Sequence, residues 1–196
     1  MIIEIEGIDG VGKTTQCRLL NHWFERQGQR SVIVKDLEST QLGRQIKSIL
    51  TADTPMTKEV ELFAFLCCKA HLFSEVIGPE LAKGAHIICD RGVGSLLSYF
   101  EDANFDNEFL NKLVKTVCPD NFAPATVLLD LDPDEALRRN VAKPTHSKFD
   151  NLGAAFFQRQ RKIFLRLAAE RNWTVIDANQ TINEIHQSIA NKLTHG

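Results

Sequence analysis

The stretch that decides the fold is Gly7-Ile8-Asp9-Gly10-Val11-Gly12-Lys13-Thr14, which directly follows the apolar run Ile2 to Glu6. It matches the pattern G-x-x-x-x-G-K-[ST], and a segment of helical period begins immediately after it. In such a loop, backbone N–H groups curl around phosphate oxygens, the following helix presents its positive end, and the lysine adds a full charge. The stretch therefore predicts a phosphate-binding loop, with the Thr14 hydroxyl placed to hold a magnesium ion.

Around this loop, short apolar runs rich in Ile and Val alternate with longer segments of helical period. That alternation predicts an α/β fold with a parallel sheet wrapped by helices, about seven in number. The joints between periodic runs fall at Gly84 and at most of the prolines, Pro79 included. One domain over residues 1–196 is expected, with a loop at residues 140–150 long enough to move. The five expected strands are Ile2 to Glu6, Ser31 to Lys35, His86 to Cys89, Thr126 to Leu131 and Trp173 to Ile176.

The composition sets limits on partners and location. The 196 residues include 23 Lys and Arg against 25 Asp and Glu, a formal net charge of −2. This balance gives no bulk attraction to nucleic acid or to an anionic membrane, so neither is expected as a partner and phosphate recognition must be local. No apolar run approaches the roughly 20 residues that span a bilayer, and a cytoplasmic location is expected. The five cysteines are expected to be mostly buried, reduced thiols.

An aspartate follows the third expected strand, where the run His86 to Cys89 ends in Asp90-Arg91. Ligands of open parallel sheets bind at the carboxyl ends of the strands, so Asp90 is placed to reach the shell of a magnesium ion held by Thr14. An aspartate at a strand end is also a common helix cap, and the residue alone leaves that alternative open.

Several further segments carry the pattern of a known family. The opening Ile5 to Gly10 runs into Gly12-Lys13-Thr14-Thr15-Gln16, and Asp90-Arg91 is followed by Ser95 and Tyr99. Thr40-Gln41-Leu42-Gly43, Leu128 to Pro133, Phe149-Asp150 and Val175 to Ala178 fit the same pattern. Together these segments resemble the thymidylate kinases over nearly the whole chain.

The resemblance implies a P-loop NTPase fold with a five-stranded parallel sheet, helices on both faces and a short mobile lid. It implies a magnesium-dependent kinase that moves the γ-phosphate of ATP to deoxythymidine monophosphate (dTMP), usually as a homodimer. Phosphoryl transfer asks mainly for in-line positioning and neutralisation of charge, which suits a pocket of charged side chains with little covalent work to do.

Carried over position by position, the resemblance implies the site residues. The expected catalytic residues are Lys13, Asp9, Arg91, Lys143 and Lys148, the last two in the lid that closes over ATP. The expected ATP and phosphate site is Gly7, Asp9, Gly10, Val11, Gly12, Lys13, Thr14, Thr15 and Arg139, and Thr14 and Asp90 are expected to organise magnesium. The expected acceptor site is Asp9, Lys35, Phe65, Lys69, Arg91, Ser95 and Tyr99, with Phe65 stacked on the base. From the residues alone, Phe65 is expected to be a core residue, and the two lid lysines are expected to lie in a solvent-exposed loop.

Several positions depart from the family's pattern, mostly in the acceptor pocket. Lys35-Asp36-Leu37-Glu38-Ser39 stands in place of Arg-Glu-Pro-Gly-Gly, and Lys69 in place of a base-reading arginine. Gly92 replaces a ring, Phe100 replaces a glutamine, and Lys148 replaces a lid arginine. A lysine keeps the positive charge of an arginine but loses its planar bidentate contact. The sequence therefore does not decide which base the acceptor carries. Three functions fit: a thymidylate kinase, a kinase of a different or modified nucleotide, and a nucleotide-binding regulatory protein without phosphotransfer.

Overall fold

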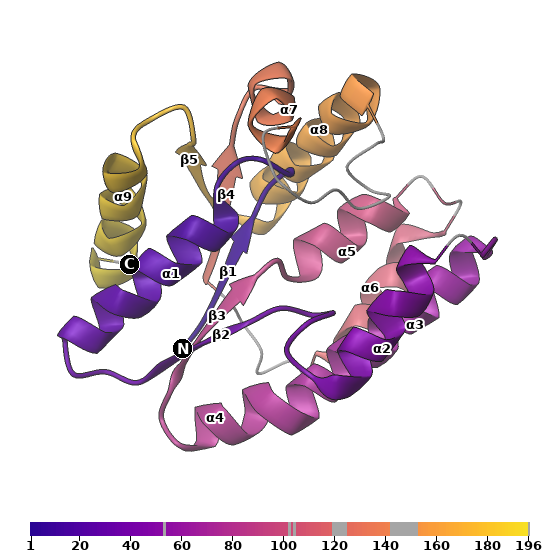
Figure 1. Ribbon diagram of the computed structural model, residues 1–196, viewed down its shortest axis with the longest axis horizontal. Coiled ribbons are helices and arrows are strands. Elements are labelled where there is room, and N and C mark those ends of the chain that lie inside the picture. The colour runs from indigo at the N-terminus through magenta and orange to yellow at the C-terminus, as the bar shows by residue number, and fades with distance from the viewer. Residues whose placement is uncertain (53, 102, 104, 119–124, 142–152, 196) are drawn as a thin grey trace.

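The five strands form one parallel sheet in the order β2-β3-β1-β4-β5 (Figure 1). The computed structural model describes the chain except for residues 53, 102, 104, 119–124, 142–152 and 196. The expected α/β fold is confirmed, and the strand bounds differ from the expected ones by one residue at most at each end. The strands are β1 (Ile2–Glu6), β2 (Ser31–Val34), β3 (His86–Asp90), β4 (Ala125–Asp130) and β5 (Thr174–Asp177). Asp90 belongs to β3, where it pairs with Ile5 of the central strand.

The described residues hold more helices than the seven expected. The α-helices are α1 (Lys13–Arg26), α2 (Gln41–Thr51), α3 (Lys58–Leu72), α4 (Gly78–Ala82), α5 (Val93–Phe100), α6 (Asn107–Val117), α7 (Pro133–Val141), α8 (Gly153–Arg171) and α9 (Ile182–His195). Figure 1 shows α1 and α9 on one side of the sheet, with α5, α6, α2 and α3 on the other.

The expected joint at Pro79 is wrong, because a π-helical turn, η1 (Phe73–Ile77), connects α3 to α4 without a break. The Gly78 N–H reaches back five residues to the Phe73 carbonyl oxygen. Pro79 is the second residue of α4, directly after this turn, so the helical path continues through the proline.

Strand β1 is buried along its whole length although it contains two acids, Glu4 and Glu6. Side chains of a strand alternate between its two faces, so Ile3 and Ile5 face one side of the sheet. Both isoleucines belong to the largest apolar cluster, together with Leu20 of α1. The two glutamates face the opposite side, toward the start of α5, where they accept hydrogen bonds from its backbone. Beyond that start, the far end of α5 enters a second apolar cluster with α3, α6 and α8.

The phosphate-binding loop packs tightly against α7. Gly10 has φ +91°, and a Cβ added there would lie 2.2 Å from the carbonyl oxygen of Ala136. Both the backbone conformation and the lack of space therefore require glycine at this position. Gly28, in the turn after α1, has φ +69° with open space around it.

We expect Gly10→Ala to lower the free energy of unfolding by about 3 kcal/mol or more, because the methyl group clashes with backbone as well as straining φ. Gly28→Ala is the matched control, since it carries only the left-handed backbone cost of about 1–2 kcal/mol. Urea unfolding of both variants measures the difference. Equal losses of stability would show that the contact between the loop and α7 adds nothing.

Candidate active site

The loop between β1 and α1 holds the Lys13 side chain against its own backbone. Gly7, Gly10 and Gly12 all have positive φ, which turns the chain sharply before α1 begins. Lys13 Nζ donates to the carbonyl oxygens of Gly7 at 2.8 Å and Ile8 at 2.7 Å, and it lies 3.6 Å from the Asp9 carboxylate. The side chain is only 6% exposed. The loop therefore fixes one cation at the point where the sequence predicts phosphate binding.

Burial, and then the charge of Arg91, lower the pKa of Lys13 to about 8. The carboxylates of Asp9, Asp90 and Glu6 act in the opposite direction. Lys13 thus remains mostly an ammonium ion at neutral pH, which is the form that attracts phosphate oxygens.

A hydroxyl and a carboxylate meet beside the loop, as expected for the magnesium site. Thr14 Oγ1, in the first turn of α1, donates to Asp90 Oδ2 at 2.6 Å, and Lys35 Nζ lies 3.0 Å from the same oxygen. Burial acts to raise the pKa of Asp90, but the Thr14 hydrogen bond and the charges of Lys13 and Lys35 lower it, so the group is a carboxylate at neutral pH.

These two oxygens fit a magnesium ion, which prefers hard oxygen ligands and takes only one or two from protein. Within the described part of the chain, no group of three or more His, Cys, Asp or Glu side chains could hold a metal ion. A metal at this site would therefore take its remaining ligands from substrate phosphates and water.

The turn that carries Arg91 lies next to the loop. Arg91 has φ +79° and forms an ion pair with Asp9, while its Nη1 donates to Ser95 Oγ at 3.1 Å. One oxygen of Asp9, Oδ1, thus contacts both Lys13 and Arg91. The structure brings together Lys13, Asp9, Arg91 and Ser95 as the sequence predicts.

Sequence reasoning missed two residues of β1, Glu4 and Glu6, which hold this turn through hydrogen bonds. Glu6 accepts hydrogen bonds from the N–H groups of Gly92 at 2.9 Å and Ser95 at 2.8 Å, and Glu4 accepts one from the Val93 N–H at 3.1 Å. These donors belong to the start of α5 and have no acceptor within the helix, so the two carboxylates cap it. The available signal was a pair of acids inside an isoleucine-rich buried strand.

The expected base platform and sugar residue lie side by side. The Phe65 ring centroid is 5.9 Å from that of Tyr99 and 5.9 Å from that of Phe100. Phe65 is only partly buried, so it contributes to the second apolar cluster while part of the residue remains accessible. The Tyr99 hydroxyl donates to Glu61 at 3.1 Å; sequence reasoning did not single out this glutamate, although it lies one helical turn before Phe65.

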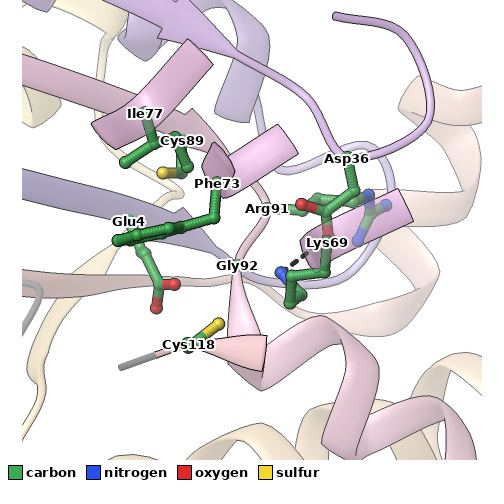
Figure 2. A pocket seen from close by; sticks show the side chains of 9 residues that line it. All are labelled: Glu4, Asp36, Lys69, Phe73, Ile77, Cys89, Arg91, Gly92 and Cys118. Atoms are coloured by element: carbon green, nitrogen blue, oxygen red, sulfur yellow. Dashed lines mark ion pairs between the residues drawn. The ribbon is translucent and has the colours of Figure 1, made fainter. Parts of the chain in front are cut away.

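Lys69 does not project freely into the site. Its Nζ lies 2.7 Å from Asp36 Oδ2, and the side chain is almost fully buried. Burial is the largest influence and acts to lower the pKa of Lys69, but the charge of Asp36, the other negative neighbours and the hydrogen bond to Asp36 together raise the pKa above its usual value. Figure 2 shows the pair among the side chains that line a small pocket, which Arg91 and Glu4 also line.

The remaining expected residues lie further out. Arg139, near the end of α7, donates to the Ala178 carbonyl oxygen at 3.1 Å and to Glu135 at 2.7 Å. Val11 packs in the largest apolar cluster, and Thr15 is exposed on α1. Lys143 and Lys148, with most of the expected lid, lie outside the described residues.

The five cysteines form no disulfide. Four are buried as expected, but Cys67 is exposed on α3. Among the helices of the described residues, none has both the length and the apolar character needed to cross a membrane.

A parallel sheet with a phosphate-binding loop after its central strand, and a Thr–Asp pair beside that loop, defines the class of P-loop phosphotransferases. A sequence model of the thymidylate kinase family matches residues 5–189, so the chain belongs to the thymidylate kinase family.

The chain is similar to thymidylate kinases over nearly its full length. The chain is 33% identical to a probable thymidylate kinase of Pyrococcus abyssi, covering 98% of this chain and 95% of that one. It is 32% identical to a thymidylate kinase of Desulforapulum autotrophicum, covering 96% and 88%. The crystal structure of a thymidylate kinase from Ehrlichia chaffeensis matches with a TM-score of 0.79 and 26% identity, over 99% of this chain and 98% of that one.

The buried acid Glu4 makes a pH prediction possible. Burial, and then the charge of Glu6, raise the pKa of Glu4 from 4.5 to about 7, although Lys69 and the Val93 N–H act against this. Between these two pH values the folded protein keeps a proton that the unfolded chain releases, so this group makes stability fall as pH rises through the window.

We expect Glu4→Gln to flatten that part of the stability curve, because the amide does not titrate. Urea unfolding of both proteins at intervals between about pH 4.5 and pH 7 measures the change. Glu80→Gln is the control: the hydrogen bonds from Lys83 and Arg30 lower the pKa of Glu80, so it titrates below the window. Parallel curves for the wild type and Glu4→Gln would contradict the prediction.

Proposed function

We propose that this protein is a thymidylate kinase that uses ATP and magnesium to convert dTMP to deoxythymidine diphosphate. One observation carries the proposal: Asp9 Oδ1 contacts both Lys13 of the phosphate-binding loop and Arg91 of the turn after β3. A phosphoryl group passing between a donor at Lys13 and an acceptor at Arg91 would be neutralised by both cations. Membership of the thymidylate kinase family makes dTMP the first candidate acceptor.

On the donor side, we assign ATP phosphates to the loop of Gly7, Gly10 and Gly12, to Lys13 and to the start of α1. Thr14 and Asp90 would hold the magnesium ion, which when bound neutralises charge on the phosphates. Lys35 lies against Asp90, so we assign it to this charge network as well as to the acceptor side. We assign Arg139, Lys143 and Lys148 to the ATP side, as the family pattern implies.

On the acceptor side, we assign the phosphate of dTMP to Arg91, with Asp9 and Ser95 orienting the guanidinium. The base would stack on the accessible part of Phe65, and Tyr99 would lie beneath the sugar. Lys69 would reach the base edge, and its ion pair with Asp36 would fix the ammonium group there.

We further propose a homodimer in the cytoplasm, with residues 1–196 as one kinase domain. Val60 and Phe63 of α3 are more than half exposed, and so is Ile49 of α2. Such apolar side chains on packed neighbouring helices suit a contact with a second copy of the chain.

An ADP-release assay tests the proposal, with ATP, magnesium and a panel of deoxythymidine, deoxyuridine, uridine, cytidine, adenosine and guanosine monophosphates. We expect selective turnover of dTMP and a loss of roughly 10²–10³-fold or more in Lys13→Ala, since removing a fixed charge from the transferring group costs about that much. Lys83→Ala is the control, because Lys83 is exposed and pairs with Glu80 away from the site. No ADP above the Lys13→Ala background with any acceptor would rule out the kinase.

A kinase for a different nucleotide is the second candidate, because Lys69 is held by Asp36 and lacks a planar pair of donors. Restoring Lys69→Arg should sharpen the preference for dTMP over the other pyrimidine nucleotides by a few fold in kcat/KM. Unchanged ratios across the pyrimidine panel would show that position 69 does not read the base.

A further inference from the structure

The Glu4 side chain occupies the space where a side chain at position 92 would lie. A Cβ added to Gly92 would be 2.0 Å from Glu4 Cδ and 2.1 Å from Glu4 Oε1. Gly92 has a negative φ of −141°, so left-handed backbone does not explain the glycine. The space taken by Glu4 explains it, and Figure 2 shows both residues lining the small pocket beside Lys69 and Arg91.

The Glu4 carboxyl also holds the backbone that follows Arg91. It accepts hydrogen bonds from the Val93 N–H at 3.1 Å and from Thr126 Oγ1 of β4 at 3.3 Å. With Glu4 only 2% exposed, water cannot readily replace it as the acceptor for these donors. The position of the carboxyl therefore fixes the first turn of α5, and through that turn the neighbouring Arg91.

We propose that Glu4 and Gly92 act as one coupled pair that positions Arg91 for the acceptor phosphate. The inference rests on the proposed function, because it gives that pair a role in acceptor binding. Glu4 is a positioning residue in this account: it acts through the backbone at Val93, while Arg91 makes the contact. A side chain at position 92 would push the Glu4 carboxyl away from Val93 and release the turn.

If Glu4 and Gly92 act as a pair, adding a methyl group at position 92 should weaken acceptor binding. A Glu4 carboxyl that only stabilised the fold would not give this result. Gly92→Ala should raise KM for dTMP on the order of tenfold and leave KM for ATP within about twofold, because only the acceptor side loses its anchor. Glu4→Ala should raise KM for dTMP in the same way, whereas Glu4→Gln, which keeps a carbonyl acceptor for Val93, should stay close to wild type.

Combining Glu4→Ala with Gly92→Ala should give a smaller increase in KM for dTMP than the product of the single effects, since the new methyl group enters the vacated space. Gly28→Ala, in the turn after α1, is the matched control. Its added Cβ would meet no atom within 4 Å, so the added methyl group does not disturb Glu4 or Glu6. Any damage from Gly28→Ala should therefore be additive with Glu4→Ala.

The experiment combines steady-state kinetics of ADP release with calorimetric binding of dTMP alone and with the melting temperature of each variant, so that only folded proteins are compared. Wild-type turnover of dTMP reports on the proposed function, and its absence would overturn that function. Wild-type turnover with multiplicative effects in the double variant, or with equal changes in KM for ATP and dTMP, would overturn the coupled pair alone. If Glu4→Ala unfolds, Glu4→Gln and Gly92→Ala still test the pair. The pair requires that Glu4→Gln bind dTMP within about threefold of wild type, and that Gly92→Ala bind dTMP more weakly than that.

Discussion

Two acids buried in the central strand of the sheet hold the turn that carries Arg91. Glu4 and Glu6 accept the N–H groups that begin α5, and the chain reaches that helix through Arg91 in a left-handed conformation. Burying an acid without hydrogen-bond partners is costly, and the start of the helix supplies donors for both of these acids. The strand and the helix therefore fix each other, and Arg91 is fixed between them.

The site shows how a chain with net charge −2 can recognise polyanionic substrates. Its cations lie beside carboxylates: Lys13 and Arg91 share Asp9, Lys35 lies against Asp90, and Lys69 against Asp36. These pairs hold the cations at defined places among buried and partly buried groups, where electrostatic interactions are stronger than in water. A local arrangement of this kind needs no positive charge on the protein as a whole.

Sequence reasoning succeeded where a function depends on short, contiguous pattern. The loop from Gly7 to Thr14 and the strand that ends in Asp90 are local features, and the structure places Thr14 against Asp90 as expected. It failed at Pro79, which was expected at a joint because proline breaks helices, whereas a π-helical turn connects α3 to α4 directly before it. It also could not show contacts between residues that are distant in the chain. The contact of Lys35 with Asp90 on a neighbouring strand is such a contact. The expected place of Lys35 on the acceptor side stays a prediction.

The sequence by itself determined the sheet, the phosphate-binding loop and the family pattern, because strand and helix periodicity and glycine spacing act over a few residues. Only the tertiary structure decided how the acceptor side is built. In the sequence, Gly92 stands where the family pattern has an aromatic ring. The fold shows that the carboxyl of Glu4 occupies the space of a side chain at this position. The two positions are 88 residues apart in the chain and meet because β1 and β3 pair directly. Contacts of that kind arise from packing across the sheet, which no local pattern encodes.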